Sequence, residues 1–482
     1  MRDRSAAPSG GLSFEALGTC ALLLVVFLLG CLMPMQNDSW WHLRVGQDIV
    51  ATGRVPVVDY LSYTAAGRPW PNHEWLAQVI FYGTHRVGGL PLLQLLGAVL
   101  MTGAWALIAT TMNPRWRPIV LGLVLPLSAS GWSLRPQLFT AFFLALMIRL
   151  LVRGRAGWLA VLFPVWANLH SGVLIAAPVL GAAIVVSYFR DRRVLPVRLA
   201  LLAAWALGSM ATPLGPGIFA HVAGTLASPV ARLLTEWQPA RFGHGLSMLF
   251  MAESALLLLL VVRRLRRPPV VRRWEDDFLG LLALMFVPLG LRSVRHISLA
   301  AMALAPALSW LAPERAGATA TAEATRTRAN TALLAMLLVG GLASVFFLWR
   351  LPLARLGWRP MSPAAAAAIA ACPDPLYNRY DDGGFLLWFV QGKRVFLDSR
   401  HDPYPHELML AQFRVQESGE PGPLFERFGF RCAVLPPDDR LATSLHTRAW
   451  RTAFADDQWW VLIAPWPAEK PKAAAPVQPT QW

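Results

Sequence analysis

Residues 37–44 read Asn-Asp-Ser-Trp-Trp-His-Leu-Arg and follow directly on the apolar run 17–35. A run of this length crosses a bilayer as a helix, because a span needs about 20 residues. Asp38, His42 and Arg44 are therefore expected at a membrane surface, beside two tryptophans of the kind that anchor chains at that interface. Ionisable groups cost free energy at such a depth and usually serve a function there. The stretch predicts chemistry at the boundary between lipid and water.

The composition is that of a polytopic membrane protein. Of the 482 residues, 55% are hydrophobic and 15% are charged, whereas roughly a quarter of the residues in a soluble domain are charged. The mean hydropathy is +0.44. The net charge of +16 does not indicate a nucleic-acid partner, because the basic residues lie mainly in short loops between apolar runs, where they set membrane orientation. No small-residue cleavage site follows the run 17–35, so we expect it to be retained as the first helix.

Ten further apolar segments raise the number of predicted transmembrane helices to about 11. Several are shorter than the ~20 residues of a full crossing, so their exact limits and number are open. We predict an α-helical polytopic membrane protein. The ten segments are residues 90–112, 118–131, 136–152, 157–169, 172–189, 196–212, 245–262, 276–291, 296–311 and 331–349.

Loop charges predict the orientation of these helices. If the N-terminus is cytoplasmic, every second loop should be basic, and five successive inner loops are. This places the first outer loop, residues 36–89, and everything after residue 350 on the extracytoplasmic side. The basic loops carry Arg115 and Arg117, Arg153 and Arg155, Arg190 to Arg193, Arg263 to Arg273, and Arg326 and Arg328.

The chain is predicted to contain three regions. Residues 1–349 form a transmembrane module that includes the first outer loop, residues 350–465 form a small α/β extracytoplasmic domain, and residues 466–482 form a disordered tail. Cys372 and Cys432 lie in the small domain and are able to pair if that domain is extracytoplasmic.

Local patterns predict several elements outside the spans. Residues 74–86 read as an amphipathic helix that lies on the membrane or leads into the next span. In the small domain we expect strands at residues 394–398 and 432–435, and helices at residues 384–390 and 406–415.

Ionisable residues gather at the predicted outer ends of helices, although they come from six different loops. Charged groups near a bilayer normally face a protein interior or a water-filled vestibule, so we expect these residues to converge on one cavity. They are Asp38, His42, Arg44, Asp59, His73, Glu74, Arg135, His170, Glu236, Arg295 and His296.

This set of side chains suits a sugar donor linked to a lipid phosphate. A carboxylate can take the proton of an acceptor, while cations or a metal neutralise the departing phosphate. Arginine is well adapted to the phosphate because its planar fork gives bidentate hydrogen bonds and stays charged in poor solvent.

Motifs at these positions continue along the chain. The first outer loop contains Asp38, then Trp40-Trp41-His42-Leu43-Arg44 and Pro71-Asn72-His73-Glu74-Trp75. Together with the later motifs they resemble the GT-C class of membrane glycosyltransferases, specifically a bacterial branch of multispanning proteins. The resemblance spans most of the chain. The later motifs are Leu134-Arg135-Pro136-Gln137, Trp166-Ala167-Asn168-Leu169-His170, Glu236-Trp237, Arg295-His296, Tyr380-Asp381-Asp382-Gly383-Gly384 and Val395-Phe396-Leu397-Asp398-Ser399-Arg400.

The resemblance implies a bacterial inner-membrane enzyme that takes a sugar from a polyprenyl-phosphate-linked donor and inverts its anomeric centre. The acceptor would be a glycan, a lipid or a protein. Asp38 is the residue that cleanly matches the first-loop carboxylate, which acts as catalytic base or helps to hold a divalent metal. The adjacent Asp-Glu pair of protein mannosyltransferases is missing, so a magnesium or manganese cofactor is left open, with Asp38, Glu74 and Glu236 as candidate ligands.

We therefore assign catalysis to Asp38 as the base, with Glu74 and His73 beside it. The expected substrate and phosphate ligands are His42, Arg44, Arg135, His170, Arg295 and His296.

Simpler interpretations accompany these assignments. Asp38 and Glu74 are also explained as charges in the first turn of a helix, Arg135 as half of a structural salt bridge, and His170 as a core histidine. We interpret Asp381-Asp382-Gly383-Gly384 as a helix cap and turn rather than a calcium or phosphate site. Two other functions stay open, namely a polymerase or ligase of lipid-linked polysaccharide and a non-enzymatic component of lipid or polysaccharide translocation.

Overall fold

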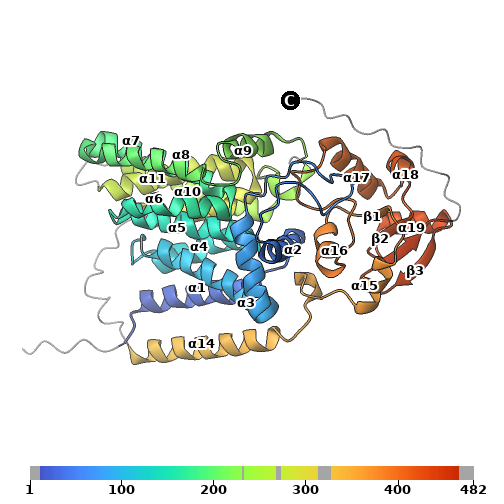
Figure 1. Ribbon diagram of the computed structural model, residues 1–482. Helices are drawn as coiled ribbons and strands as arrows, with labels where there is room; N and C mark the ends of the chain where they lie inside the picture. Colours follow the sequence, from blue (N-terminus) through green and yellow to red (C-terminus); the bar gives the residue numbers. More distant parts are fainter. Residues whose placement is uncertain (1–10, 231–232, 267–272, 313–326, 466–482) are drawn as a thin grey trace, which may run out of the picture. The chain divides into compact units, whose positions relative to one another are not determined.

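The structure is a computed structural model that describes residues 11–230, 233–266, 273–312 and 327–465 (Figure 1). The predicted disordered tail, residues 466–482, lies outside the described residues. The chain divides into two compact units. We call Met1–Pro34 with Thr84–Pro352 the helical unit, and Met35–Gly83 with Leu353–Trp482 the α/β unit.

The predicted spans all coincide with helices. Local signals begin and end many of them: the Ser13 hydroxyl accepts from the Ala16 amide at the start of the first helix, and proline occupies the first turn of two others. The helices are α1 (Phe14–Gly30), α3 (Trp75–Ala109), α4 (Arg117–Ala129), α5 (Gln137–Val152), η1 (Ala156–Trp158), α6 (Leu159–Leu169), η2 (Ser171–Ile175), α7 (Ala176–Arg190), η3 (Arg192–Val194), α8 (Leu195–Ser209), α9 (Gly217–Ala227), η5 (Thr235–Trp237), α10 (Gly245–Leu265), α11 (Trp274–Arg292), η6 (Val294–His296), α12 (Ile297–Leu311) and α14 (Arg328–Leu348).

Five of the described segments are long and apolar enough to cross a membrane: Trp75–Ala109, Ser171–Arg190, Gly245–Leu265, Val294–Leu311 and Arg328–Leu348. Other apolar helices are shorter, among them α1, α4 and α5. The chain is thus a multi-pass helical protein, while the predicted total of about 11 crossings stays a prediction.

Helix α3 joins two predicted segments. Its regular geometry breaks at Gly88 and Gly89, where φ is −142° and 63°, and Pro91 follows directly. Glycine reaches the positive φ without strain, and proline begins the next helix without needing its missing N–H. The predicted amphipathic helix 74–86 is the first half of α3 and leads into the span 90–112.

Within the helical unit, α12 occupies the centre of the packing. It lies against α4, α10 and α11, and nearly every residue from Ile297 to Ser309 is buried. Alanines supply much of this sequence, so the neighbouring helices approach closely. Helices α1 and α14 lie side by side in both views (Figure 1). Helix α9 was not predicted, since its 11 residues lie in the segment 213–244 that we assigned to an outer loop.

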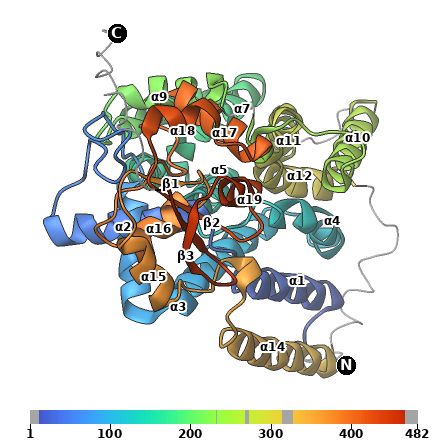
Figure 2. The same ribbon diagram turned by 90° about the vertical axis from the view of Figure 1, so that its right-hand side faces the viewer.

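The α/β unit contains a four-stranded sheet with the order β1-β2-β4-β3. Strands β1 and β2 are parallel and the other pairs are antiparallel. Figure 2 shows α16 beside α2, two helices that pack together in this unit. Its elements are α2 (Asn37–Thr52), η7 (Ala354–Leu356), α15 (Pro363–Ala370), β1 (Leu376–Asn378), α16 (Gly383–Phe389), α17 (His406–Ser418), α18 (Gly422–Phe428), β2 (Cys432–Leu435), α19 (Arg440–Thr447), β3 (Arg451–Ala455) and β4 (Trp460–Ile463).

The core of this unit joins the first outer loop to the C-terminal residues. Trp41, Val45 and Ile49 line one face of α2 at helical spacing and pack in one hydrophobic cluster with Leu386 and Val434, among others. The division therefore differs from the predicted one, which gave the loop 36–89 to the transmembrane module. We also expected both tryptophans to anchor the chain at the lipid interface. Trp41 instead belongs to this core and is only 6% exposed.

One predicted strand is wrong. Residues 394–398 make a single bridge, between Val395 and Ser62, rather than a ladder. The Asn378 side chain takes the place of a neighbouring strand, because it accepts from the Phe396 amide at 2.8 Å and donates to the Leu397 carbonyl at 2.8 Å. The expected strand at 432–435 is β2, and the expected helices are α16 and α17.

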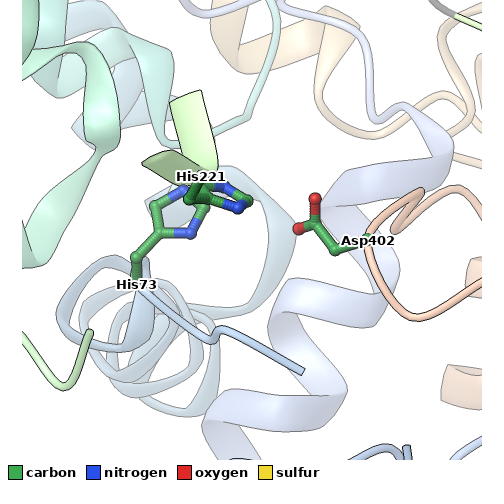
Figure 3. A group of neighbouring side chains, drawn as sticks. All are labelled: His73, His221 and Asp402. Carbon is green, nitrogen blue, oxygen red and sulfur yellow. The ribbon is translucent and has the colours of Figure 1, made fainter. Parts of the chain in front are cut away.

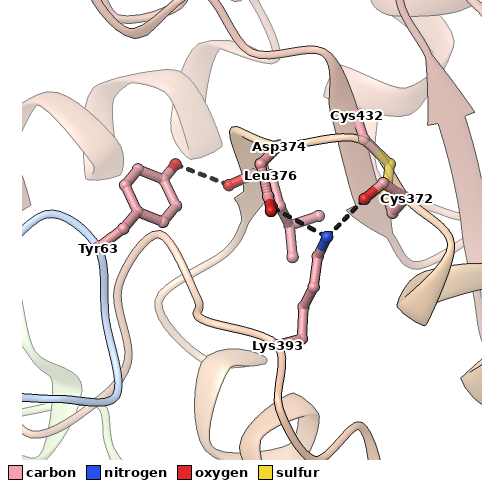
Figure 4. The surroundings of a disulfide bond; sticks show 6 residues. All are labelled: Tyr63, Cys372, Asp374, Leu376, Lys393 and Cys432. Carbon is pink, nitrogen blue, oxygen red and sulfur yellow. Dashed lines mark hydrogen bonds and ion pairs between the residues drawn. A yellow bond between two sulfur atoms is a disulfide. The ribbon is translucent and has the colours of Figure 1, made fainter.

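Cys372 and Cys432 form a disulfide with a Cα–Cα distance of 5.9 Å (Figure 4). Lys393 donates to the Cys372 carbonyl and pairs with Asp374 at 2.9 Å. Nearby, the hydroxyl of Tyr63 from the first outer loop donates to the Leu376 carbonyl at 2.8 Å. These contacts connect the first outer loop with β1 and β2 beside the disulfide.

Candidate active site

Asp38 lies in the first turn of α2, where the helix dipole favours a carboxylate. Its Oδ1 accepts a hydrogen bond from the Ser399 hydroxyl at 2.5 Å and a longer one, 3.4 Å, from the Trp41 indole. Ser399 is 361 residues away in the sequence. The carboxylate is thus held by its own helix and by the C-terminal part of the same unit. A carboxylate that only complements the helix dipole does not require the second contact.

Two glycines explain how the C-terminal part comes so close to α2. A Cβ atom on Gly384 would lie 2.2 Å from the Asn37 carbonyl oxygen, and one on Gly383 would lie 2.2 Å from the Leu397 carbonyl oxygen. The Asn37 side chain also donates to Asp381 at 2.9 Å. The acidic Gly-Gly motif is therefore a point of close backbone approach as well as the start of α16.

A buried ion network holds the loop that carries Ser399. Arg400 pairs with Asp59 at 2.6 Å and with Asp398 at 2.8 Å, and the three side chains are fully buried. The Tyr404 hydroxyl donates to Asp398 at 2.9 Å. Burial by itself lowers the pKa of Arg400, but the neighbouring carboxylates outweigh it and raise that pKa well above its usual value. Sequence reasoning placed Asp59 in the site, whereas the structure gives it this structural pairing.

A second group of ionisable side chains in the first outer loop contains both imidazoles and carboxylates. Glu74 Oε2 lies 3.7 Å from His42 Nε2, and Glu74 Oε1 lies 3.8 Å from His73 Nε2. A ring nitrogen of His73 lies within 4.8 Å of an Asp402 carboxylate oxygen (Figure 3). Burial raises the pKa of Asp402 to about 7, although the charge of Arg400 opposes the shift. Figure 3 also labels His221, which belongs to α9 of the helical unit.

Arg44, a predicted substrate ligand, makes contacts that explain it locally. Its Nε pairs with Asp48 at 3.0 Å, one helical turn away, and its Nη1 donates to the Leu387 carbonyl of α16 at 3.2 Å. The Tyr60 hydroxyl donates to the same Asp48 at 2.7 Å. Burial and this hydrogen bond raise the pKa of Tyr60. Arg44 thus helps to fix α2 against α16.

In the helical unit, two predicted phosphate ligands meet on one carboxylate. Arg135 lies 2.9 Å from Glu236 Oε2 and Arg295 lies 2.6 Å from Glu236 Oε1. Arg295 also stacks on the Trp237 ring at 5.1 Å, and His296 meets that ring edge-on. The three charged residues come from separate loops, and two arginines that we predicted as phosphate ligands share one carboxylate.

His170 has a local role at the start of η2. Its Nδ1 accepts from the Gly172 amide at 2.9 Å and lies 2.8 Å from the Thr140 hydroxyl. The Trp166 indole donates to the same hydroxyl at 3.0 Å. These contacts match the core-histidine interpretation.

The donor sets decide which candidate residues suit a metal. Magnesium prefers oxygen ligands, but the described contacts of Glu74 are to imidazoles, and those of Glu236 are to two guanidinium groups that repel a cation. Asp38 is held by a hydroxyl and an indole. The three candidate ligands therefore have three different environments, and their role as metal ligands stays a prediction.

No protein-family model matches the sequence, and no curated protein matches it. Solved structures do. The oligosaccharyltransferase AglB from Archaeoglobus fulgidus, in complex with an inhibitory peptide and a dolichol-phosphate, aligns over 86% of this chain and 69% of its own, with a TM-score of 0.52 at 11% identity. The chain has the GT-C fold.

Two further solved structures are similar to this chain. The apo form of the Archaeoglobus fulgidus oligosaccharyltransferase covers 87% of this chain and 69% of its own, at 11% identity and a TM-score of 0.49. ArnT from Cupriavidus metallidurans, bound to undecaprenyl phosphate, covers 94% of this chain and 98% of its own, at 14% identity and a TM-score of 0.47. Sequence reasoning found the GT-C landmarks in the first loop but missed Ser399 and Asp381 as neighbours of α2.

Proposed function

We propose that the protein is a membrane glycosyltransferase that moves a sugar from a polyprenyl-phosphate-linked donor to an acceptor on the extracytoplasmic side. The observation that carries this proposal is the contact between Asp38 and Ser399. It fixes a carboxylate directly after the first apolar helix of a GT-C fold, at the place where the resemblance puts a catalytic base. The dolichol-phosphate in the AglB complex supports a lipid-phosphate donor.

In the proposed reaction, Asp38 accepts the proton of an acceptor hydroxyl while that oxygen attacks the anomeric carbon. The bond from the anomeric carbon to the phosphate oxygen breaks, and the lipid phosphate departs with the electron pair. A single displacement of this kind inverts the anomeric centre. The hydrogen bond from Ser399 fixes the rotamer of the carboxylate and so acts through positioning.

The arginine pair on Glu236 is the proposed site for the phosphate. Arg135 and Arg295 both present guanidinium groups, which bind phosphate in bidentate fashion. The shared carboxylate holds the two groups near each other in the absence of a ligand. His296 beside the same tryptophan is a further proposed contact, while local contacts explain Arg44 and His170 without a substrate.

We propose that the α/β unit is extracytoplasmic and that the N-terminus of this bacterial inner-membrane protein is cytoplasmic. Loop charges support this orientation. The disulfide between Cys372 and Cys432 supports it independently, because disulfides persist in oxidising compartments and are rare in the cytosol.

The test uses the purified full chain in lipid nanodiscs with polyprenyl-phosphate-linked sugars and an envelope extract as acceptor. Mass spectrometry follows the release of polyprenyl phosphate. We expect turnover by the wild type and at least a tenfold rise of KM for the donor in Arg135→Gln and Arg295→Gln. Arg241→Gln is the matched control, since this exposed arginine contacts Gln238 rather than Glu236.

Wild-type protein that binds polyprenyl phosphate but transfers no sugar with any donor would refute the enzymatic proposal and favour a translocation component. Products that grow by whole lipid-linked repeat units would favour the polymerase or ligase.

A further inference from the structure

Helix α5 ends in a tight turn that leads into η1 and α6. Gly154 has a positive φ of 67°, and the Arg155 amide donates to the Leu150 carbonyl at 2.9 Å. This is the Schellman arrangement, in which the chain leaves the helix through a left-handed residue. Ala156 and Leu159 are buried directly after it. The turn therefore holds a fixed position between α5 and α6, two helices of the helical unit that pack together.

Three arginines lie at this turn, and we call them the arginine cluster: Arg149 in the last turn of α5, Arg153 and Arg155. The charges of Arg153 and Arg155 both act against that of Arg149, so they lie within electrostatic range of it. Among the described residues, no carboxylate pairs with any member of the cluster. In the same part of the chain, Arg149 Nη1 is buried without a hydrogen-bond partner.

Membrane orientation and the helix dipole explain part of this arrangement. Basic residues mark cytoplasmic loops, and a cation is favourable at the C-terminal end of a helix. However, Arg149 and Arg153 are four residues apart, and like charges at this spacing destabilise a helix. A buried donor without a partner also costs free energy. A bound anion would remove both costs.

A surface cavity of about 440 Å³ lies at the cluster and is lined by Arg155, Gly157 and Trp158. Trp158 is 67% exposed, and Val161 and Val165 of α6 are 66% and 42% exposed. Because residues three and four apart share one helix face, these three side chains form an exposed apolar strip that begins at the cavity. The strip is about 10 Å long, since a helix rises by about 1.5 Å per residue.

We propose that the arginine cluster and the apolar strip bind an anionic phospholipid, with its phosphate at the guanidinium groups and an acyl chain along the strip. Charge complementarity identifies this occupant. Guanidinium groups bind phosphate in bidentate fashion, and basic pockets between membrane helices bind lipid head groups of this kind. A soluble anion would use the cluster but not the strip.

This lipid site is separate from the proposed sugar-transfer site, because it shares no residue with the Glu236 pair or with Asp38. The proposed orientation places the turn on the cytoplasmic side, where the membrane surface is negatively charged. A bound phospholipid would offset the repulsion within the cluster and connect α5 with α6. It should therefore stabilise the helical unit.

The test measures lipid binding and does not depend on sugar transfer. The full chain is purified in detergent, freed of lipid and titrated with phosphatidylglycerol in native mass spectrometry. Phosphatidylcholine and inorganic phosphate are the comparison ligands, and thermal unfolding is followed by tryptophan fluorescence. We expect tight binding of phosphatidylglycerol, weaker binding of the zwitterionic lipid and no displacement by inorganic phosphate. The unfolding midpoint should rise with phosphatidylglycerol, because a ligand of the folded state stabilises it.

Variants separate a lipid site from general surface charge. Replacing the whole arginine cluster by glutamine should lower the affinity for phosphatidylglycerol roughly a hundredfold, because each basic residue near an anionic lipid contributes about a factor of five. Trp158→Ala should weaken the binding of both lipids, since it removes the start of the strip. The matched control replaces three exposed arginines at other helix ends by glutamine and should keep wild-type affinity; these are Arg193, Arg263 and Arg266.

Wild-type affinity in the cluster variant, or an equal loss in the matched control, would overturn the proposal. Displacement of the lipid by inorganic phosphate would also overturn it, because the cluster would then bind a soluble anion. If the cluster variant fails to fold, Arg155→Gln is compared with Arg193→Gln. Only Arg155→Gln should weaken binding, by about fivefold, and equal affinities of the two variants would contradict the proposal.

Discussion

Replacing Arg400 by methionine tests the buried network that holds the Ser399 loop. The variant leaves Asp59 and Asp398 as two carboxylates in a place where the three side chains have no exposure. Removal of one partner of a buried ion pair costs about 3–5 kcal/mol. An independent route gives a similar value, because keeping one aspartic acid protonated at pH 7 costs about 4 kcal/mol relative to its ordinary pKa.

This loss should lower the unfolding midpoint by roughly 10 °C, since 1 kcal/mol shifts a unit of this size by roughly 2–4 °C. The assay is thermal unfolding in nanodiscs, read by tryptophan fluorescence. The deficit should shrink between pH 7 and pH 5, because protonating a carboxylate becomes cheaper by about 1.4 kcal/mol per pH unit. Arg359→Met is the control, since Arg359 pairs with Asp457 at the surface. An Arg400→Met midpoint within 2 °C of wild type, or a deficit that does not change with pH, would refute the reasoning.

Three further predictions concern the same unit. Ser399→Ala should lower kcat for sugar transfer about tenfold to a hundredfold with little change of KM, because a hydrogen bond to a charged group contributes about 1.5–3 kcal/mol. Ser399→Thr should restore kcat, and an unchanged kcat in the alanine variant argues against a positioning role. The Cys372→Ser and Cys432→Ser double variant should lose about 4 kcal/mol of unfolding free energy, because the disulfide closes a loop of 60 residues. Denaturant unfolding without reductant measures this loss, and wild-type curves that are equal with and without reductant speak against the bond. Gly384→Ala should destabilise the unit by more than about 2 kcal/mol, because its Cβ would overlap a backbone oxygen. Gly83→Ala has open space in α3 and should be neutral or stabilising. Similar unfolding midpoints of the two variants would contradict the close approach.

Sequence reasoning located the helices well because their signal is local. An apolar run with a basic loop at one end needs no distant partner to be recognised, as for α5 or α10. The GT-C fold was also within reach, since its landmarks follow the first helix and recur at helix ends. Helix α9 was missed because 11 apolar residues are too few to indicate a span.

Local sequence patterns could not predict that the first outer loop and the C-terminal residues form one unit. The face of α2 made by Trp41, Val45 and Ile49 shows that the helix is amphipathic, but it does not show that the partner is Leu386. The wrong strand at residues 394–398 has the same origin. Its alternating residues fit a strand, while the amide that would join a ladder is taken by the side chain of Asn378.

The candidate site was predicted in part. Asp38 and the arginine pair came from motif position and loop charge, and their roles in the reaction stay predictions. The pairing of Arg135 with Glu236 is also the structural salt bridge that the simpler interpretation expected. Ser399 was missed because it lies 361 residues from Asp38 in the sequence. The alternation of His42, Glu74 and His73 was visible only as separate polar residues, since their facing atoms depend on the turn before α3.

The most direct test of the account is the turnover of Asp38→Asn beside Asp48→Asn. Both substitutions remove a carboxylate from α2, but Asp48 is paired with Arg44 and serves the fold. With a polyprenyl-phosphate-linked sugar as donor, Asp38→Asn should lose at least a hundredfold in kcat, in line with the contribution of about 10²–10⁴ of a general base, while the folded Asp48→Asn protein keeps turnover within about threefold of wild type. Near-normal turnover by folded Asp38→Asn protein would contradict the assignment of the base.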